Sequence, residues 1–547
     1  MRFAAMALCA VLLWPAAASA TTYLVRPDGT GDFPTIQAGI DAASTGDIIQ
    51  LEEGLFRGPG NCDLDYRGKA ITIRSRNGDP AGVVIDGEAV YRGAYFHTGE
   101  GAGSILEAIT IRNGIPPWFT ETGGGIVCRS ASPSIVRCRI TACNGFNGGG
   151  GIFCDAGAAP TIRDCALDGN RADYGGGIYA SGSSPTVVSC SITENTATWE
   201  GGGLYFYEST ASVDSSVVSL NQTLVPTSYG YGGALSCEFS TLKLRHCTLE
   251  GNRAWGFAGV FCNWHSQVVI ENSSCRGNSS SGYWADDGAL CCAYHSSMEL
   301  IDCTVTGNAG GGISCSEYSS VEIQGSTIAG NRSGRGGGLT IWTMAEAHLS
   351  RSIVWGNCAS LEGDQIFVEQ YSEVSLSCCD ADRGGIEGAG IVTWDESSFS
   401  GDPRFCGPME CTEAPTSDGD YHLWNYSPCN QEGCGLIGAW PVGCEDPQAA
   451  GGEVVASGVK LWTVPNPFTG GTTIGYKLGA TASTGGVSVA IYDVAGRMVR
   501  TLQAPGVTGK LSWDGTDDAG RALPGGIYLL RLTGDGRTVT ERVVRIR

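Results

Sequence analysis

Short segments in which apolar and polar residues alternate recur along the chain, each preceded by a run of glycines. GGGIYASGSSPTVVSCSITEN, from Gly175 to Asn195, is one such unit. The last small residue of the glycine run recurs at steps of 23 to 31 residues: Gly125, Gly151, Gly177, Gly203, Ala234, Gly259, Ala289, Gly312 and Gly338. A repeat of this length predicts a solenoid. Its short β-branched runs predict strands, since no helical spacing of apolar residues is present.

Two rows of small or apolar residues align across the nine units and predict the interior of the solenoid. Side chains two residues apart on a strand point to the same face. The second row begins at Cys138 and has an apolar partner two residues later, such as Ile140. The first row follows the glycines: Cys128, Cys154, Ala180, Phe206, Cys237, Cys262, Cys292, Cys315 and Ile341. With coils stacked at about 4.8 Å, these rows fill a narrow parallel β-helix.

An asparagine lies five residues after the second row in eight of the nine units: Asn170, Asn195, Asn221, Asn252, Asn278, Asn308, Asn331 and Asn357. Cys143 takes this place in the first unit. A stacked amide donates to one neighbouring coil and accepts from the other, which satisfies backbone groups at a buried bend. We therefore expect a structural asparagine ladder.

The glycine–aliphatic motif and the Leu167-Asp168-Gly169-Asn170 motif recur with these rows. They resemble the right-handed parallel β-helix superfamily of pectate lyases, and most closely its polymorphic outer-membrane-protein type of repeat. Leu or Ile replaces the Phe of the F-x-x-N motif, so the likeness is to the repeat type. It covers residues 123–357 strongly and 48–440 loosely. The resemblance implies an all-β fold, a right-handed parallel β-helix solenoid, and a small Ig-like β-sandwich is expected after it.

The two ends of the solenoid carry signals of their own. Residues 1–20 have the charged start, short apolar core and small-residue cleavage site of a secretory signal peptide. Residues 21–47 are expected to form an N-terminal cap with a short helix, on which Ile36, Ile40 and Ala43 share one face. Residues 48–444 then form the β-helix with its closing coil, and residues 445–460 a linker.

Cysteines crowd the expected closing coil: Cys406, Cys411, Cys429, Cys434 and Cys444. Their two C-x4-C spacings leave a zinc site as an alternative. Secretion and the loose spacing favour disulfides. The cysteines of the inward rows are expected to be mostly buried thiols that act as small apolar side chains.

Residues 461–547 use a different set of motifs. Alternating strands between turn residues predict a small β-sandwich. Motifs such as Trp513-Asp514-Gly515 and Pro524-Gly525-Gly526 resemble the FlgD Ig-like domain and the C-terminal sorting domains of Bacteroidetes-type secretion. The resemblance implies an accessory module for surface delivery or assembly, with secretion or envelope machinery as its partner.

The chain is acidic, with a formal net charge of -22. An acidic surface repels phosphate backbones, so nucleic acid is not expected as a partner. Asp514, Asp517 and Asp518 are either a Ca²⁺ site or a hairpin turn, and the turn is favoured because a D-x-D-x-D-G loop is absent. No other cofactor or metal is expected. No stretch after residue 20 is apolar enough to span a membrane, so a secreted, cell-surface-associated protein is expected.

Aromatic residues are the strongest surface signal in the repeats. In four units the residue between the inward pair is aromatic and points outward, and a second set follows at the next turn. The ligand-binding candidates are Phe153, Tyr179, Tyr205, Tyr207, Phe239, Phe261, Trp264 and Tyr294. Exposed rings stack on sugar C–H faces, and neighbours such as Glu200, Glu238 and His265 can hydrogen-bond hydroxyls. The alternative is that the rings stack for stability or lie under loops.

Catalytic residues cannot be assigned from the sequence. Polygalacturonase and pectin methylesterase signatures are absent, and Asp286-Asp287 is an isolated acidic pair in the repeat core. We expect a non-catalytic, adhesin-like or glycan-binding protein whose partner is a polysaccharide or cell-surface glycan. A polysaccharide lyase or glycoside hydrolase is the first alternative, and a purely structural envelope protein is the second. Converging carboxylates would favour the enzyme, and a flat aromatic strip would favour the binding protein.

Overall fold

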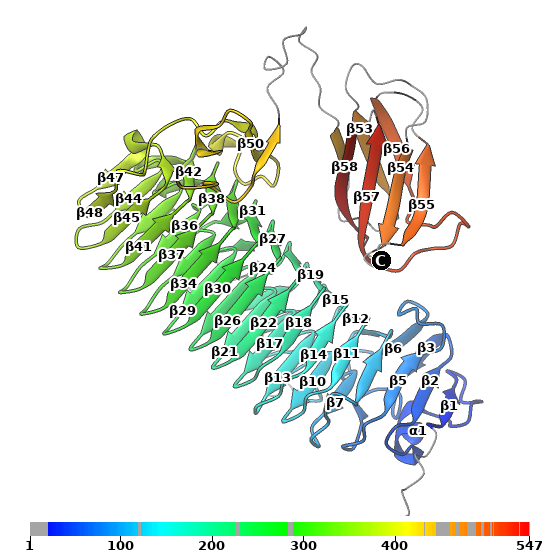
Figure 1. The fold of residues 1–547 in the computed structure, drawn as a ribbon. Coiled ribbons are helices and arrows are strands. Elements are labelled where there is room, and N and C mark those ends of the chain that lie inside the picture. The colour runs from blue at the N-terminus through cyan, green and yellow to red at the C-terminus, as the bar shows by residue number, and fades with distance from the viewer. Residues whose placement is uncertain are drawn as a thin grey trace, which may run out of the picture.

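The computed structural model describes residues 20–444 apart from 119–121, 225–229, 283–287 and 431–432, and residues 460–545 apart from 465–467, 469, 478–487, 494–496, 504–505, 507 and 535–536. The expected signal peptide and linker lie almost entirely outside these residues, as does Asp286-Asp287. In the described part, three parallel sheets wind around one core from the blue end to the yellow end of Figure 1. The predicted β-helix solenoid is confirmed.

A complete coil of the solenoid contributes one strand to each of three sheets, and sheet 1 extends beyond the other two at its ends. Sheet 1 has 15 strands: β1 (Thr22–Val25), β2 (Ile48–Leu51), β5 (Thr72–Ser75), β8 (Ile105–Glu107), β11 (Ser134–Val136), β14 (Thr161–Arg163), β18 (Thr186–Val188), β22 (Thr210–Asp214), β26 (Thr241–Arg245), β30 (Gln267–Glu271), β34 (Ser297–Ile301), β37 (Ser320–Gln324), β41 (Glu346–Ser350), β45 (Glu373–Ser377) and β48 (Ile391–Trp394). Sheet 2 has 13 strands: β4 (Leu64–Asp65), β7 (Ala94–Phe96), β10 (Ile126–Arg129), β13 (Ile152–Asp155), β17 (Ile178–Ser181), β21 (Leu204–Tyr207), β25 (Leu235–Glu238), β29 (Val260–Asn263), β33 (Leu290–Cys292), β36 (Ile313–Cys315), β40 (Leu339–Ile341), β44 (Ile366–Val368) and β47 (Ile386–Gly388). Sheet 3 also has 13: β3 (Gly54–Arg57), β6 (Val83–Asp86), β9 (Thr110–Arg112), β12 (Arg139–Thr141), β15 (Ala166–Asp168), β19 (Ser191–Thr193), β23 (Val217–Ser219), β27 (Thr248–Glu250), β31 (Ser274–Arg276), β35 (Thr304–Thr306), β38 (Thr327–Ala329), β42 (Ile353–Trp355) and β46 (Asp380–Ala381).

Smaller strands fill the corner between sheets 3 and 2. A flank sheet contains β16 (Arg171–Tyr174), β20 (Thr196–Glu200), β24 (Gln222–Thr223), β28 (Arg253–Ala254) and β32 (Ser279–Ser280). A further pair is β39 (Arg332–Arg335) with β43 (Cys358–Glu362). The flank sheet lies just before the glycine runs, so it borders the outer face of sheet 2.

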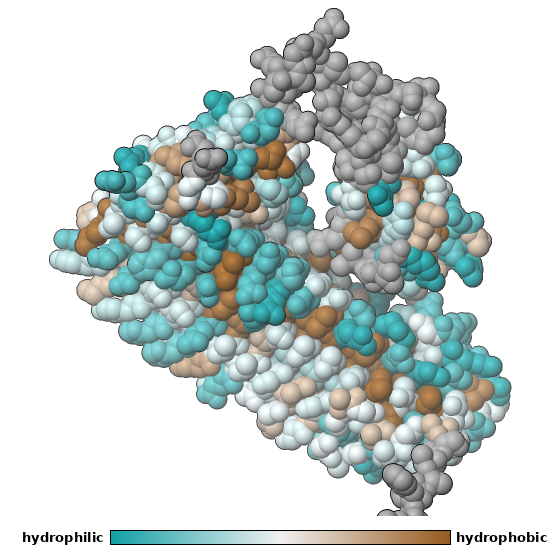
Figure 2. Space-filling view, viewed as in Figure 1, coloured by the Kyte–Doolittle hydropathy of each residue, from teal (hydrophilic) through white to brown (hydrophobic). Residues whose placement is uncertain are grey.

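The first inward row is confirmed along its whole length. Its nine members are paired in register on neighbouring strands of sheet 2 and are fully buried. Most of the solenoid face visible in Figure 2 is hydrophilic or neutral, with a broken line of apolar patches along it. Period-2 alternation therefore sends the apolar residues into the coil interior. A Cβ on Gly177 would lie 2.6 Å from the carbonyl oxygen of Gly203, so glycine permits the close approach of successive coils here.

The asparagines form a hydrogen-bonded row from coil to coil. The Asn170 side chain donates to Oδ1 of Asn195 at 3.0 Å and to the Ile140 carbonyl at 2.9 Å. The Asn170 backbone N–H donates to the same Asn195 oxygen at 3.0 Å. The pattern repeats down to Asn357, whose amide donates to Oε1 of Gln365 at 2.9 Å. Gln365 was not predicted because it follows Asn357 by only eight residues, far less than one repeat.

A serine ladder, absent from the predictions, runs beside the turn that leads into sheet 1. Each serine hydroxyl accepts the backbone N–H of the preceding serine at 3.0 to 3.1 Å. Its members are Ser183, Ser209, Ser240, Ser266, Ser296 and Ser319. Serine is common in turns, so only the register of the stacked coils distinguishes these six.

The N-terminal cap contains the expected short helix, α1 (Ile36–Ala42). The Thr35 hydroxyl accepts the Ala38 N–H at 3.2 Å and caps its start. Ile36 and Ile40 are buried against the first coil, together with Ala43. Among the described residues, no helix has the length and apolar character to cross a membrane.

The closing region, residues 399–444, packs over the last coils of sheet 3 and contains β49 (Phe405–Gly407), β50 (Asp420–Trp424) and β51 (Val442–Cys444). Short 3-10 turns lie at Arg383–Gly385, Cys411–Glu413 and Pro428–Asn430. Its disulfides are Cys358–Cys411, Cys378–Cys434 and Cys406–Cys444.

One of the five expected disulfide cysteines was assigned wrongly. Cys429 is buried and unpaired, and its thiol donates to Oδ2 of Asp380 at 3.1 Å. Cys358 and Cys378 form disulfides instead, because the closing region folds back onto coils more than fifty residues earlier in the chain. Every free cysteine of the described residues is buried.

The C-terminal domain is a small sandwich of two antiparallel sheets. One has β52 (Lys460–Val464), β53 (Thr472–Lys477) and β56 (Thr508–Trp513). The other has β54 (Ser488–Asp493), β55 (Met498–Gln503), β57 (Gly526–Gly534) and β58 (Arg537–Arg545). Trp513 and Tyr476 lie at the centre of its core. Asp514 accepts from Thr516 and Asp517 accepts from Ala519 and Arg521, so these carboxylates hold turn backbone.

Candidate functional site

The outer face of sheet 2 is polar and aromatic at β21, β25 and β29. Side chains alternate in direction along each strand. Phe206, Cys237 and Cys262 point into the core, so the residues before and after each of them point outward. One outward row pairs Tyr205 with Ser236 and then Phe261. The next outward row, two residues on, contains Tyr207, Glu238 and Asn263.

Three of the outward aromatics are not exposed, contrary to the prediction. Phe153 and Tyr205 are each 5% exposed and Phe261 is 3% exposed. Phe153 packs edge-on against Tyr179, and rings that precede the glycine runs lie against Tyr205 and Phe261. Tyr174 of β16 lies 5.1 Å from Tyr205, and Phe257 lies 4.7 Å from Phe261, between ring centroids. Tyr179 is half-buried beside the same Tyr174. The alternative that these rings lie under neighbouring segments is therefore correct for this row.

Two glutamates meet beside Tyr205, and we call them the glutamate pair. Glu200 ends β20 of the flank sheet, and its Oε2 accepts the Ser236 hydroxyl at 2.7 Å. Burial, and then the charge of Glu238, raise the pKa of Glu200 to about 8. Burial also raises the pKa of Glu238, which hydrogen bonds from Asn263 and Tyr205 partly offset. At neutral pH Glu200 is thus a carboxylic acid, and it lies near a second carboxyl group whose pKa is also raised.

The second set of predicted aromatics is exposed, at the turn from sheet 2 into sheet 1. Phe239, Trp264 and Tyr294 are 45%, 42% and 38% exposed. Trp264 and Tyr294 are stacked with centroids 4.5 Å apart and planes 13° apart, and Phe239 lies 6.4 Å from Trp264. This spacing follows that of the coils. Tyr207 is half-buried and contacts Phe239 edge-on at 6.0 Å.

A parallel row of rings lies directly beside this one. His265 stacks on His295 at 5.3 Å, and His295 stacks on Tyr318 at 5.2 Å. All six residues have positive φ, between 45° and 60°, so the turn holds them in a left-handed conformation. We call them the turn stripe: Phe239, Trp264, His265, Tyr294, His295 and Tyr318. His295 and Tyr318 were missed, although each follows its neighbour at the spacing of the repeat.

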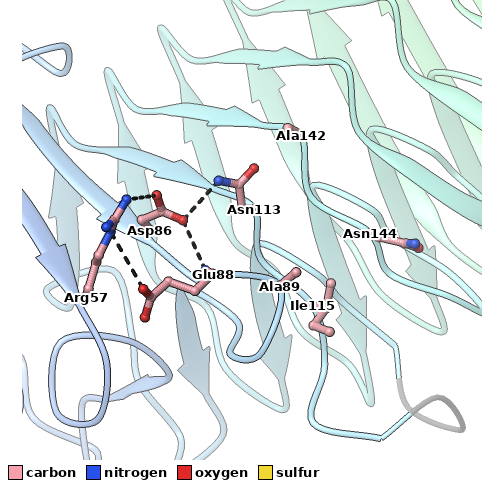
Figure 3. A pocket seen from close by; sticks show the side chains of 8 residues that line it. All are labelled: Arg57, Asp86, Glu88, Ala89, Asn113, Ile115, Ala142 and Asn144. Atoms are coloured by element: carbon pink, nitrogen blue, oxygen red, sulfur yellow. Dashed lines mark hydrogen bonds and ion pairs between the residues drawn. The ribbon is translucent and has the colours of Figure 1, made fainter.

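A separate pocket of about 530 Å³ lies near the N-terminal end of sheet 3 (Figure 3). Asp86 is at its centre and accepts from Arg57, Asn113 and the Glu88 backbone at 3.0 to 3.3 Å. Burial opposes ionisation of Asp86, but the hydrogen bonds from Asn113, the Glu88 backbone and Arg112 hold its pKa below its usual value. These partners occupy the buried carboxylate, so the network is a structural one.

The described residues contain no group of three or more His, Cys, Asp or Glu side chains placed to hold a metal ion. The zinc alternative for the closing region gives way to the disulfides described above. The chemistry available on sheet 2 is therefore that of the glutamate pair, tyrosine hydroxyls and exposed rings.

Two family models match the chain. One, described as a right handed beta helix region, matches residues 56–195, 106–274, 177–344 and 258–402. The other, the FlgD Ig-like domain, matches residues 463–537. No curated protein matches the chain.

Solved structures give low-identity matches. Pectate lyase Pel9A is 13% identical to the chain, and the match covers 78% of this chain and 97% of Pel9A with a TM-score of 0.31. The PL6 family alginate lyase AlyGC is 11% identical, with 70% and 79% covered and a TM-score of 0.26. PorZ, a surface component of the type-IX secretion system of Porphyromonas gingivalis, is 23% identical over 16% of this chain and only 11% of PorZ, with a TM-score of 0.13. At these identities and scores the likenesses say nothing about activity.

Proposed function

Starting from the fact that the chain belongs to the right-handed β-helix family and ends in a FlgD Ig-like domain, we propose that it is a glycan-binding protein of the cell surface. The turn stripe is the proposed binding surface. The observation that carries the proposal is a row of large rings that stay exposed and stack on one another along one edge of the solenoid. Disulfides indicate a location outside the cytosol.

The chemistry of the turn stripe supports a sugar ligand. Trp264 and Tyr294 combine an apolar body with a polar tip, which suits the mixed C–H and hydroxyl surface of a pyranose. Glu238 precedes Phe239 and Glu317 precedes Tyr318, so acceptors for hydroxyl groups lie next to the rings. Neighbouring rings partly cover each other's faces, so a ligand would contact the outer edges and the ends of the stack.

Binding to a glycan and polysaccharide array by the secreted chain tests the proposal. Replacement of Trp264 or Tyr294 by alanine should weaken binding by about tenfold, which corresponds to about 1.4 kcal/mol. Trp118→Ala removes an exposed ring elsewhere in the chain and is the matched control, expected to bind as the wild type does. Equal affinity in Trp264→Ala and Trp118→Ala would show that the turn stripe is not the binding surface.

The glutamate pair favours a second candidate, a polysaccharide-cleaving enzyme. A protonated Glu200 near a second carboxyl group, Glu238, is the kind of carboxyl pair that glycosidic cleavage uses. Release of reducing or unsaturated sugar from the same array would identify the enzyme, and Glu200→Gln and Glu238→Gln should each abolish it. Neither binding nor release would leave the structural envelope role, the third alternative.

The C-terminal domain is proposed to serve delivery or assembly at the cell surface through secretion or envelope machinery. The proposed division of the chain is a signal peptide at 1–20, a cap at 21–47, the β-helix at 48–444, a linker at 445–460 and the Ig-like domain at 461–547. Deletion of residues 461–547 in the native host should move the solenoid from the cell surface to another fraction. An unchanged surface fraction would contradict this role.

A further inference from the structure

A second cavity lies between the closing region and the outer face of sheet 3. It measures about 380 Å³, within the range of small-molecule sites. β38 and β42 contribute one wall, and β49, β50 and the chain around them contribute the other. We call it the cap pocket. It lies on a different sheet from the turn stripe and the glutamate pair.

Cross-links hold the two walls of the cap pocket in place. Cys358–Cys411 joins the coil that follows Trp355 to the residue next to Glu410, and Cys406–Cys444 joins β49 to β51. Tyr421, which is buried, forms the floor against Gly330, where a Cβ would lie 2.6 Å from the tyrosine oxygen. The pocket is therefore preformed, which lowers the entropic cost of binding.

The lining combines rings with ionised groups. Trp424 and Tyr426 are stacked with centroids 5.8 Å apart and planes 27° apart, and Trp355 faces the same cavity from β42. Tyr426 is exposed and both tryptophans are half-buried. Arg404 pairs with Asp402 at 3.2 Å on the exposed rim, and Glu410 lines the pocket too.

We propose that the cap pocket binds one neutral pyranose unit. The rings supply flat surfaces for the C–H face of the sugar, and the rim supplies donors and acceptors for its hydroxyls. The lining carries two carboxylates against one guanidinium, and the whole chain is acidic, so a uronic acid is disfavoured. This site is independent of the turn stripe.

Saturation-transfer NMR on the full secreted chain tests the cap pocket. The probes are methyl β-D-glucopyranoside, methyl β-D-galactopyranoside and, as the acidic counterpart, methyl β-D-glucuronide. At least one neutral glycoside should receive saturation, and the glucuronide should receive at least fivefold less. Trp424→Ala and Tyr426→Ala should each weaken the neutral probe at least fivefold. Tyr426 is exposed, so its variant tests binding without a threat to the fold.

Trp264→Ala separates this proposal from the preceding one. Trp264→Ala should leave the saturation-transfer signal of the neutral glycoside unchanged. Trp424→Ala should leave binding of the array ligand to the turn stripe unchanged. Three results would overturn the cap pocket: no signal with either neutral glycoside, an unchanged signal in both Trp424→Ala and Tyr426→Ala, or stronger binding of the glucuronide.

Discussion

Glu200 shows how one position in the stacked coils acquires unusual chemistry. It lies at the end of a flank strand and is half-buried beside Ser236 of the next coil. Burial and the nearby Glu238 both oppose its charge, so its pKa rises to about 8. Ser236 supplies a single hydrogen bond, too little to stabilise the anion fully. A carboxylic acid that persists at neutral pH is the result.

This raised pKa predicts a pH-dependent stability. The folded state holds the Glu200 proton up to about pH 8, whereas the unfolded chain releases it near 4.5. Stability is therefore highest below pH 4.5 with respect to this group and declines as pH rises to 8, by about 5 kcal/mol. Glu200→Gln should remove most of that decline, as measured by urea denaturation at several pH values.

Glu194→Gln, which changes an exposed glutamate of the same repeat unit, is the control for that experiment. Its pH profile should match that of the wild type. A decline in Glu200→Gln as steep as that of the wild type would contradict the assignment. Burial also raises the pKa of Asp380 to about 6, so a smaller slope below pH 6 should remain in both variants.

The element that repeats in this protein is the coil, and the ladders join one coil to the next. Asn252 shows how one side chain joins its neighbours: its Oδ1 accepts hydrogen bonds from both the backbone N–H and the side-chain amide of Asn221 at 3.0 Å. Its own amide donates to the Val218 carbonyl and to Asn278. All these groups are buried, so no water could replace the lost partner.

Asn252→Ala should therefore destabilise the solenoid by about 3 kcal/mol, because it leaves several buried polar groups of neighbouring coils unsatisfied. Urea denaturation followed by circular dichroism measures this loss. Asn430→Ala removes an exposed asparagine of the closing region and should cost less than about 0.5 kcal/mol. Similar losses in the two variants would contradict the structural role of the ladder.

At the scale of the whole molecule, the solenoid is an open stack that needs covered ends. α1 covers the first coil, and the closing region covers the last coils with help from the disulfides. The Cys378–Cys434 disulfide joins residues 56 apart in the sequence and links the closing region to the turn that follows β45. The closing region and the outer face of β38 and β42 share a small hydrophobic cluster, separate from the main core.

Loss of the Cys378–Cys434 link should release the closing region first. The double variant Cys378→Ser, Cys434→Ser should lose about 3 kcal/mol of stability. Limited proteolysis should then cut within residues 399–444 while the coils stay resistant. Cys303→Ser changes a buried, unpaired cysteine in the solenoid interior. It is the control and should leave the closing region protected from protease. Equal cleavage in the two proteins would contradict the prediction.

Much of the fold was readable from single rows of residues. The spacing of Cys128, Asn170 and their counterparts predicted the strand register, because one coil repeats one environment. The disulfide partners Cys358 and Cys378 were not readable, since they depend on where the closing region folds back. The same holds for Ser236 and Asn263, which matter only because they lie beside the glutamate pair.

Local periodicity alone determined the solenoid, its buried rows and the presence of outward rings, because side-chain direction follows from position along a strand. Tertiary structure alone decided which rings are exposed. Tyr205 and Phe261 point outward yet are covered by Tyr174 and Phe257, whereas Trp264 stacks on the rings of its own row and stays exposed. The physical reason is that burial depends on what packs against a residue from elsewhere in the chain, and alternation along a strand carries no record of that neighbour.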